Sequence, residues 1–144
     1  MSTPEGRVKD SLKRLLARLG PYVHASWPVQ NGMGSPMLDC HTTAYSYSVV
    51  IECKAPGELP SPRQWITIGA LRAAGAFVFV YDYDGVRGER HSHEDVEYAL
   101  AALRNGHRQT AKDHSSRNID LCRRAQEFAD TKRSLRMAGK ASRG

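Results

Sequence analysis

The sequence has no long hydrophobic run and only three cysteines among its 144 residues. No apolar stretch is long enough to cross a bilayer, and the first residues, Met1 to Glu5, do not resemble a signal peptide. The cysteines are odd in number and lack the spacing of a metal site, so we expect free thiols in a reducing compartment. These absences predict a cytoplasmic protein that does not enter a membrane.

Several catalytic motifs are also missing. The sequence contains no phosphate-binding P-loop and no glycine-rich dinucleotide motif. No serine or cysteine stands in a pattern typical of a nucleophile. Cys40 and His41 are adjacent, but neighbouring residues of a strand point to opposite faces and cannot form a dyad. The chemistry must therefore come from other side chains.

Charge is distributed unevenly along the chain. Residues 1–103 hold ten Lys or Arg and eleven Asp or Glu, whereas residues 104–144 hold eleven and four. The net charge of +6 therefore comes from the second segment. Such a segment attracts a polyphosphate backbone without reading sequence, but it is equally typical of a solvated tail. The length fits one domain, which we place at 1–103, followed by a basic helical extension at 104–144.

Hydrophobic patterning predicts an alternation of helices and strands. Helices are expected at 5–19, 64–74, 92–103 and 118–137. Strands are expected at 22–29, 37–41, 44–52 and 76–81, with a hairpin turn at Thr42 and Thr43. Helix 64–74 connects two strands, so these two should be parallel, while the hairpin makes another pair antiparallel. The expected fold class is α/β, with a central mixed β-sheet flanked by helices.

Two acids and a lysine stand around the strand 44–52. Asp39 precedes it, and Glu52 and Lys54 lie at its end, where residues two apart share one face. Carboxylates supply the hard oxygen ligands that Mg2+ or Mn2+ prefers, and a neighbouring lysine can orient a water or neutralise a phosphate. Cys53 points to the other face, so only its backbone carbonyl can face the metal. This arrangement predicts metal-assisted phosphodiester cleavage, with Asp39, Glu52 and the Cys53 carbonyl as ligands.

The residues around these acids resemble the VRR-NUC family, a branch of the PD-(D/E)xK nuclease superfamily. The similarity lies in four ordered segments, Gly34–Asp39, Ile51–Pro56, Ser61–Gln64 and Leu71–Val80. An acid-x-lysine motif alone occurs by chance in most proteins, whereas this ordered set is specific. The resemblance covers about residues 5–83 and departs from the family pattern at Leu38, where a proline often stands. Proline binds no metal, so the departure leaves the ligand set intact.

The resemblance implies a restriction-endonuclease-like fold and roles for individual residues. Lys54 would be catalytic, stabilising the developing charge or the attacking water. Gln64, at a helix start, would help place the lysine, the water or a phosphate, and Arg63 would bind phosphate. Glu5 would join the metal shell directly or through water, as helix-1 glutamates of the superfamily do. Alternatively, Glu5 only complements the helix dipole.

Further side chains are candidates for nucleic-acid contacts. His24 and Trp27 precede the first acid and could stack on or hydrogen-bond to nucleic acid, although single aromatic residues more often pack. In the basic extension the candidates are Arg123, Arg124, Lys132 and Arg133.

The resemblance therefore implies a Mg2+- or Mn2+-dependent DNA endonuclease that leaves 5′-phosphate and 3′-hydroxyl ends. Stand-alone family members of this size are often phage-encoded, which implies the host cytoplasm, and some resemble Holliday-junction resolvases, which implies branched DNA. Two symmetric cuts need two active sites, so a homodimer is expected. One alternative is a catalytically silent nuclease fold that binds nucleic acid or a host protein. Another is a structural role in which the basic segment recruits the chain to nucleic acid or an acidic protein.

Overall fold

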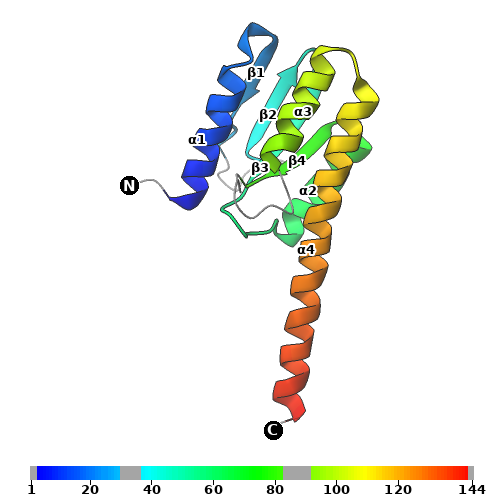
Figure 1. Ribbon diagram of the computed structural model, residues 1–144. Helices are drawn as coiled ribbons and strands as arrows, with labels where there is room; N and C mark the ends of the chain where they lie inside the picture. The colour runs from blue at the N-terminus through cyan, green and yellow to red at the C-terminus, as the bar shows by residue number, and fades with distance from the viewer. Residues whose placement is uncertain (1–2, 30–36, 83–91, 143–144) are drawn as a thin grey trace.

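The computed structural model describes residues 3–29, 37–82 and 92–142. Figure 1 shows the elements, and their order confirms the predicted alternation of helices and strands. They are α1 (Pro4–Ala17), a 3-10 turn (Gly20–Tyr22), β1 (Val23–Ser26), β2 (Cys40–Ala44), β3 (Tyr47–Cys53), α2 (Pro62–Ala73), β4 (Phe77–Tyr81), α3 (Ser92–Arg104) and α4 (Arg108–Ser142).

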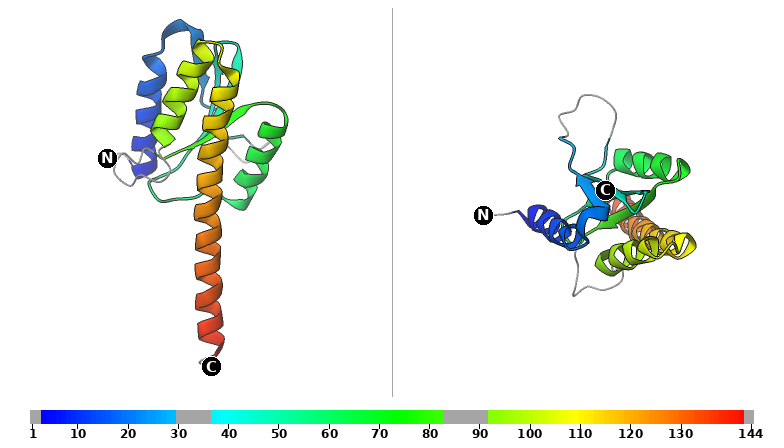
Figure 2. Two further views of the ribbon diagram at one scale, coloured as in Figure 1. Left: turned by 45° about the vertical axis from the view of Figure 1, so that its right-hand side comes forward. Right: turned by 90° about the horizontal axis from the view of Figure 1, so that it is seen from above.

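These strands form one sheet in the order β1-β2-β3-β4. β1 with β2 and β2 with β3 pair antiparallel, whereas β3 and β4 pair parallel because α2 carries the chain back between them. Helices cover both faces of the sheet: α1 and α3 lie on one side and α2 on the other (Figure 2). α4 runs along the β4 edge and packs Ile119 and Cys122 into the core on the α2 side. The predicted α/β architecture with a mixed sheet flanked by helices is confirmed. Within the described ranges, no helix combines the length and apolar character needed to span a membrane.

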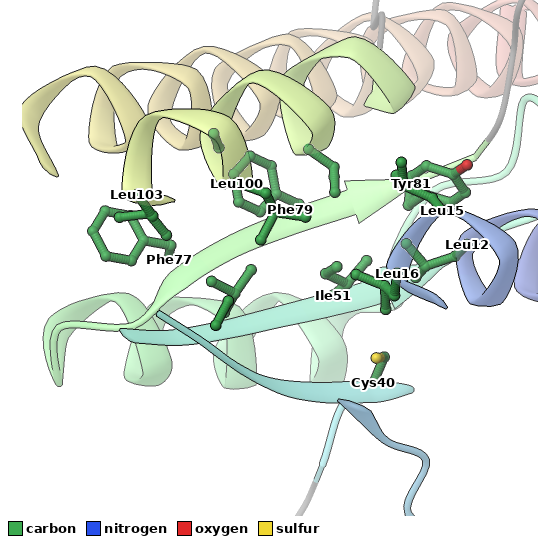
Figure 3. Close-up of a cluster of buried hydrophobic side chains, with 14 of the residues drawn as sticks. Leu12, Leu15, Leu16, Cys40, Ile51, Phe77, Phe79, Tyr81, Leu100 and Leu103 are labelled. Carbon is green, nitrogen blue, oxygen red and sulfur yellow. The ribbon is translucent and has the colours of Figure 1, made fainter. Parts of the chain in front are cut away.

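The larger hydrophobic core lies between the sheet and the helices α1 and α3. α1 begins after Thr3, whose hydroxyl accepts a hydrogen bond from the backbone of Gly6 at 3.0 Å, and its apolar residues recur at helical spacing. Leu12 of α1, Ile51 of β3 and Phe79 of β4 are fully buried in this core (Figure 3). This packing fixes α1 against β3, which carries Glu52, and against the start of β2, which Asp39 precedes.

The first half of α4 completes the other side of the sheet and protects its edge. Ile119 and Cys122 are buried against β3 and β4. The Asn118 side chain accepts from the backbone N–H of Val80 at 2.8 Å and donates to its carbonyl at 3.0 Å. These two bonds satisfy backbone groups on the outer side of β4, an edge strand that would otherwise present them unpaired. The predicted boundary between 103 and 104 thus falls next to a helix whose first half belongs to the core.

The second half of α4 extends away from the body of the domain (Figures 1 and 2). Every described side chain from Asp130 to Ala141 is exposed, including the large apolar Leu135. The helix is also longer than predicted, because it begins ten residues earlier than the expected 118 and continues to Ser142. The apolar pattern missed its beginning because few apolar side chains precede Ile119 in this helix.

The predicted hairpin turn at Thr42 and Thr43 is wrong. These threonines lie within β2, opposite Val49 and Ser48, and the chain turns at Tyr45 and Ser46. Both turn residues have positive φ values, 50° and 73°, as a tight hairpin of this twist requires. The sequence has neither Asn nor Gly here, so it carries none of the usual signal for such a turn. As a consequence β2 is Cys40–Ala44, and Asp39 precedes it in a bend instead of lying within a strand.

A candidate metal and phosphate site at the end of the sheet

Asp39 and Glu52 meet at the carboxyl end of β3. Glu52 is one residue from the end of that strand, and Cys40 pairs with Ile51, which places the bend at Asp39 beside Glu52. The backbone N–H of Asp39 donates to Oε2 of Glu52 at 3.2 Å. The backbone N–H of Cys53 donates to Oδ2 of Asp39 at 2.9 Å. Each carboxylate is therefore held by the strand segment that carries the other.

Lys54 and Gln64 both approach the same oxygen of Glu52. The Lys54 ammonium lies 3.7 Å from Oε1, and the Gln64 amide nitrogen donates to Oε1 at 2.8 Å. Gln64 is oriented by a capping box at the start of α2, in which its side-chain oxygen accepts from the backbone N–H of Ser61 at 2.9 Å. With its oxygen engaged by the cap, the amide group turns its nitrogen toward Glu52. The structure thus brings Glu52, Lys54 and Gln64 together at the end of β3.

Lys9 of α1 is a fifth side chain of the site, and sequence reasoning missed it. Its ammonium lies 3.4 Å from Oδ1 of Asp39, and its side chain is 33% exposed against 13% for that of Asp39. Lys9 borders the apolar stripe of α1 that contains Val8 and Leu12, and this was its only signal in the sequence. The site is thus a pair of carboxylates with one lysine from each side, Lys9 beside Asp39 and Lys54 beside Glu52.

Burial and the neighbouring charges shift the pKa values of Glu52 and Lys9. Glu52 is only 2% exposed, and burial together with the neighbouring charge of Asp39 raises its pKa to about 8, although Lys54 opposes the shift. Burial alone would lower the pKa of Lys9, but the charges of Asp39 and Glu5 outweigh it and raise that pKa above the ordinary value. A further positive charge, placed between the two carboxylates, would relieve the repulsion between them.

The donor set fits a hard divalent cation. Asp39 and Glu52 offer carboxylate oxygens, and the Cys53 carbonyl follows directly at the same strand end. Mg2+ keeps several waters and is commonly bound by only one or two carboxylates, so two protein carboxylates suffice. In the described part of the chain no group of three or more His, Cys, Asp or Glu side chains forms a metal cage. The Cys53 thiol points away from the carboxylates and is fully buried in the core on the α1 side, and burial raises its pKa strongly.

Glu5 and Arg63 lie on the two helices that border the site. Glu5 is in the first turn of α1, four residues before Lys9, and it influences the site through the charge of that lysine. Arg63 is exposed and precedes Gln64 in the first turn of α2. Its position is compatible with the predicted contact to phosphate.

The structure does not bring His24 to the carboxylates. His24 is exposed on β1 opposite Thr43, four residues along β2 from Asp39, which corresponds to about 13 Å of strand. Trp27 is half-buried against the larger core, with the Lys13 ammonium 4.9 Å from its ring centre. Trp27 therefore has a packing role.

The four candidates in α4 have different surroundings. The guanidinium of Arg123 lies 5.2 Å from the ring centre of Trp65, and the ammonium of Lys132 lies 5.9 Å from that of Phe128. Arg124 and Arg133 are exposed. Arg133 lines a hollow together with Trp65. Further basic side chains, Arg136 and Lys140, are exposed along the projecting half of the helix.

Comparison of the chain with protein-family models, with curated proteins and with solved structures found no match.

Proposed function

We propose that this protein is a divalent-metal-dependent DNA endonuclease with a restriction-endonuclease-like fold, similar to the VRR-NUC family. The observation that carries the proposal is the interlocked pair Asp39 and Glu52, with Lys54 and Gln64 on one Glu52 oxygen. The pattern that suggested the family places these residues on separate elements, and folding gathers them at one end of the sheet. The raised pKa of Glu52 adds support, because a bound cation would compensate for a buried pair of like charges.

Mg2+ or Mn2+, held by Asp39, Glu52 and the Cys53 carbonyl, would neutralise charge on the phosphate and make a water easier to deprotonate. Lys54 would stabilise negative charge that develops on the phosphate, since its ammonium already stands beside the carboxylates. Gln64 fixes the rotamer of Glu52 through the 2.8 Å hydrogen bond. The hydrogen bond from the Cys53 amide already fixes the Asp39 carboxylate, so little conformational entropy is lost when a cation binds.

The substrate and assembly follow from the same proposal. The substrate is DNA, and branched DNA such as a Holliday junction is the proposed form. A junction has two-fold symmetry, so paired cuts need two copies of this site and a homodimer. The proposed location is the cytoplasm, that of the host cell if the chain is phage-encoded.

The test is cleavage of end-labelled four-way junction, flap, duplex and single-stranded DNA in Mg2+, in Mn2+ and in EDTA. Wild type is compared with Lys54→Ala and with Lys112→Ala, a matched loss of one exposed lysine far along the chain. Metal-dependent cleavage that is lost only in Lys54→Ala is the expected result. Binding without cleavage by wild type would instead favour the catalytically silent nuclease-fold module.

A further inference from the structure

A hollow of about 470 Å³ lies where the start of α2 meets the middle of α4. Figure 1 shows α2 next to the middle of α4, and the contact between Trp65 and Gln126 joins the two helices. Its apolar wall includes Pro60, Pro62 and Trp65, and its polar wall, from α4, includes Gln126, Asp130 and Arg133. We call this feature the Trp65 hollow. Its volume is within the range of small-ligand pockets.

Trp65 is held in place from α4. Its indole N–H points to the side-chain oxygen of Gln126 at 3.5 Å, and the Arg123 guanidinium lies over the ring at 5.2 Å. The residue is half-buried, so the ring is fixed by its neighbours and still contributes to the surface of the hollow. A fixed aromatic ring flanked by prolines offers a flat apolar surface to another flat ring.

The polar wall has hydrogen-bonding groups at a defined spacing. Gln126 donates from its amide nitrogen to Oδ1 of Asp130 at 3.1 Å, one helical turn further on. A carboxylate accepts from ring N–H and exocyclic amino groups, which cytosine, adenine and guanine present on their edges. Arg133 stands exposed beyond Asp130 and offers a cation for a phosphate. The hollow thus combines a stacking surface, a base-edge acceptor and a phosphate contact.

The hollow is adjacent in sequence to the catalytic candidates. Trp65 directly follows Gln64, whose amide holds Glu52. A nucleotide with its base in the hollow would therefore have its strand near the carboxylate pair. A base can stack on a protein ring only when a neighbouring base does not cover its face, so the ligand must be unpaired or unstacked.

We propose that the Trp65 hollow binds one unpaired base of a DNA strand by stacking on Trp65, with Asp130 on the base edge. This inference rests on the proposed nuclease function and narrows its substrate to DNA with single-stranded or unstacked positions. Intact duplex cannot supply the base and binds through its backbone alone.

The first test uses the fluorescence of Trp65 itself. The chain has two tryptophans, so Trp27→Phe leaves Trp65 as the only indole. This protein is titrated in EDTA, which prevents metal-dependent cleavage, with a short single-stranded deoxyadenosine oligonucleotide and with the same strand annealed to its complement. We expect saturable quenching by the single strand and little by the duplex. Equal quenching by both, or none by either, would overturn the proposal.

The second test blocks the hollow without touching Trp65. Ala129 lines the hollow and is half-buried, whereas Ala138 is exposed further along the same helix. Binding of the labelled single strand is measured by fluorescence anisotropy for Ala129→Leu, for the matched control Ala138→Leu and for Trp65→Leu. We expect roughly tenfold or greater weakening in Ala129→Leu and Trp65→Leu, because one base stack is lost. Unchanged binding in Ala129→Leu would overturn the proposal even if Trp65→Leu fails to fold.

The two tests of the Trp65 hollow can fail without the proposed nuclease function failing, and the reverse is also true. If the hollow takes no base but Lys54→Ala still abolishes metal-dependent cleavage, the nuclease stands and the hollow does not. If the single strand quenches Trp65 but no substrate is cut, the base site stands and the nuclease does not.

Discussion

Asp39 and Glu52 hold each other in place through the backbone. Asp39 donates its N–H to Oε2 of Glu52, and the residue after Glu52 donates its N–H to Oδ2 of Asp39. The two side chains are thirteen positions apart, in the bend before β2 and near the end of β3. This reciprocal arrangement brings two carboxylates together, and it explains why the pKa of Glu52 is raised by burial and by Asp39.

Glu52→Gln tests whether the carboxylate pair binds a cation. The isosteric amide removes one of two charges, so the stabilisation of the fold by Mg2+ or Mn2+ should be largely lost. Thermal unfolding with and without each cation measures this, and Glu58→Gln, at an exposed position outside the site, is the control. An equal cation-induced shift in Glu52→Gln and wild type would contradict the assignment.

The raised pKa of Glu52 predicts that the stability of the metal-free protein depends on pH. Its folded-state pKa of about 8 exceeds the ordinary value of 4.5, so the folded state binds the proton more tightly than the unfolded state. The contribution of Glu52 to the free energy of unfolding is therefore fully present below about pH 4.5 and is lost as the pH rises through about 8. Urea unfolding across this range should show a steeper decline in wild type than in Glu52→Gln. Parallel profiles would show that the carboxyl is not buried as described.

Lys9→Met should strengthen binding of the divalent cation. Lys9 now pairs with Oδ1 of Asp39 at 3.4 Å and must be displaced or shared when a cation arrives. Because the pair is partly exposed, its loss should tighten Mn2+ binding by only about two- to fivefold. Isothermal titration of the metal-free protein measures the affinity. Lys13→Met, on the same helix beside Trp27, should leave it unchanged, and weaker binding in Lys9→Met would show that this lysine supports the metal.

Asn118→Ala should destabilise the domain through the edge of β4. The substitution leaves the N–H and the carbonyl of Val80 without their side-chain partner in a fully buried environment. The expected cost is about 3 kcal/mol, since each unsatisfied buried group costs roughly 1–3 kcal/mol. Urea unfolding of Asn118→Ala and of Asn105→Ala, an exposed position in the turn after α3, gives the comparison. A similar small loss in both variants would contradict a role for Asn118 at the sheet edge.

Shortening α4 should separate folding from electrostatic binding. A chain that ends at Asp130 loses only exposed side chains among the described residues, so it should fold, whereas one that ends at Leu103 loses Ile119 and Cys122 from the core and should not. The chain that ends at Asp130 lacks the basic end of the helix. Its affinity for DNA should fall, and the dependence of that affinity on salt should become less steep. Circular dichroism checks the fold, and binding at several salt concentrations checks the charge effect. An unchanged salt slope would exclude this end of α4 as an anchor.

The local part of the site could be predicted because its rules act over a few residues. Glu52 and Lys54 share a face since alternate residues of a strand do so. Gln64 was predicted at a helix start, and the structure adds the capping box that it forms with Ser61. The turn at Tyr45 and Ser46 could not be predicted, because its positive φ values are imposed by the strands on both sides and not by glycine or asparagine. Because Cys40 pairs with Ile51, Asp39 lies in the bend beside Glu52 and not in the predicted strand.

By itself, the sequence determined the order of helices and strands, the mixed sheet, and the acid and lysine at the end of β3, because hydrophobic periodicity and strand alternation are local properties. Only the tertiary structure decided that Lys9 faces Asp39, that Asn118 closes the edge of β4 and that Trp65 meets Gln126. These partners are 30 to 61 positions apart. Periodicity shows which face of a helix is buried, but the neighbour of that face is set by how all the layers pack together.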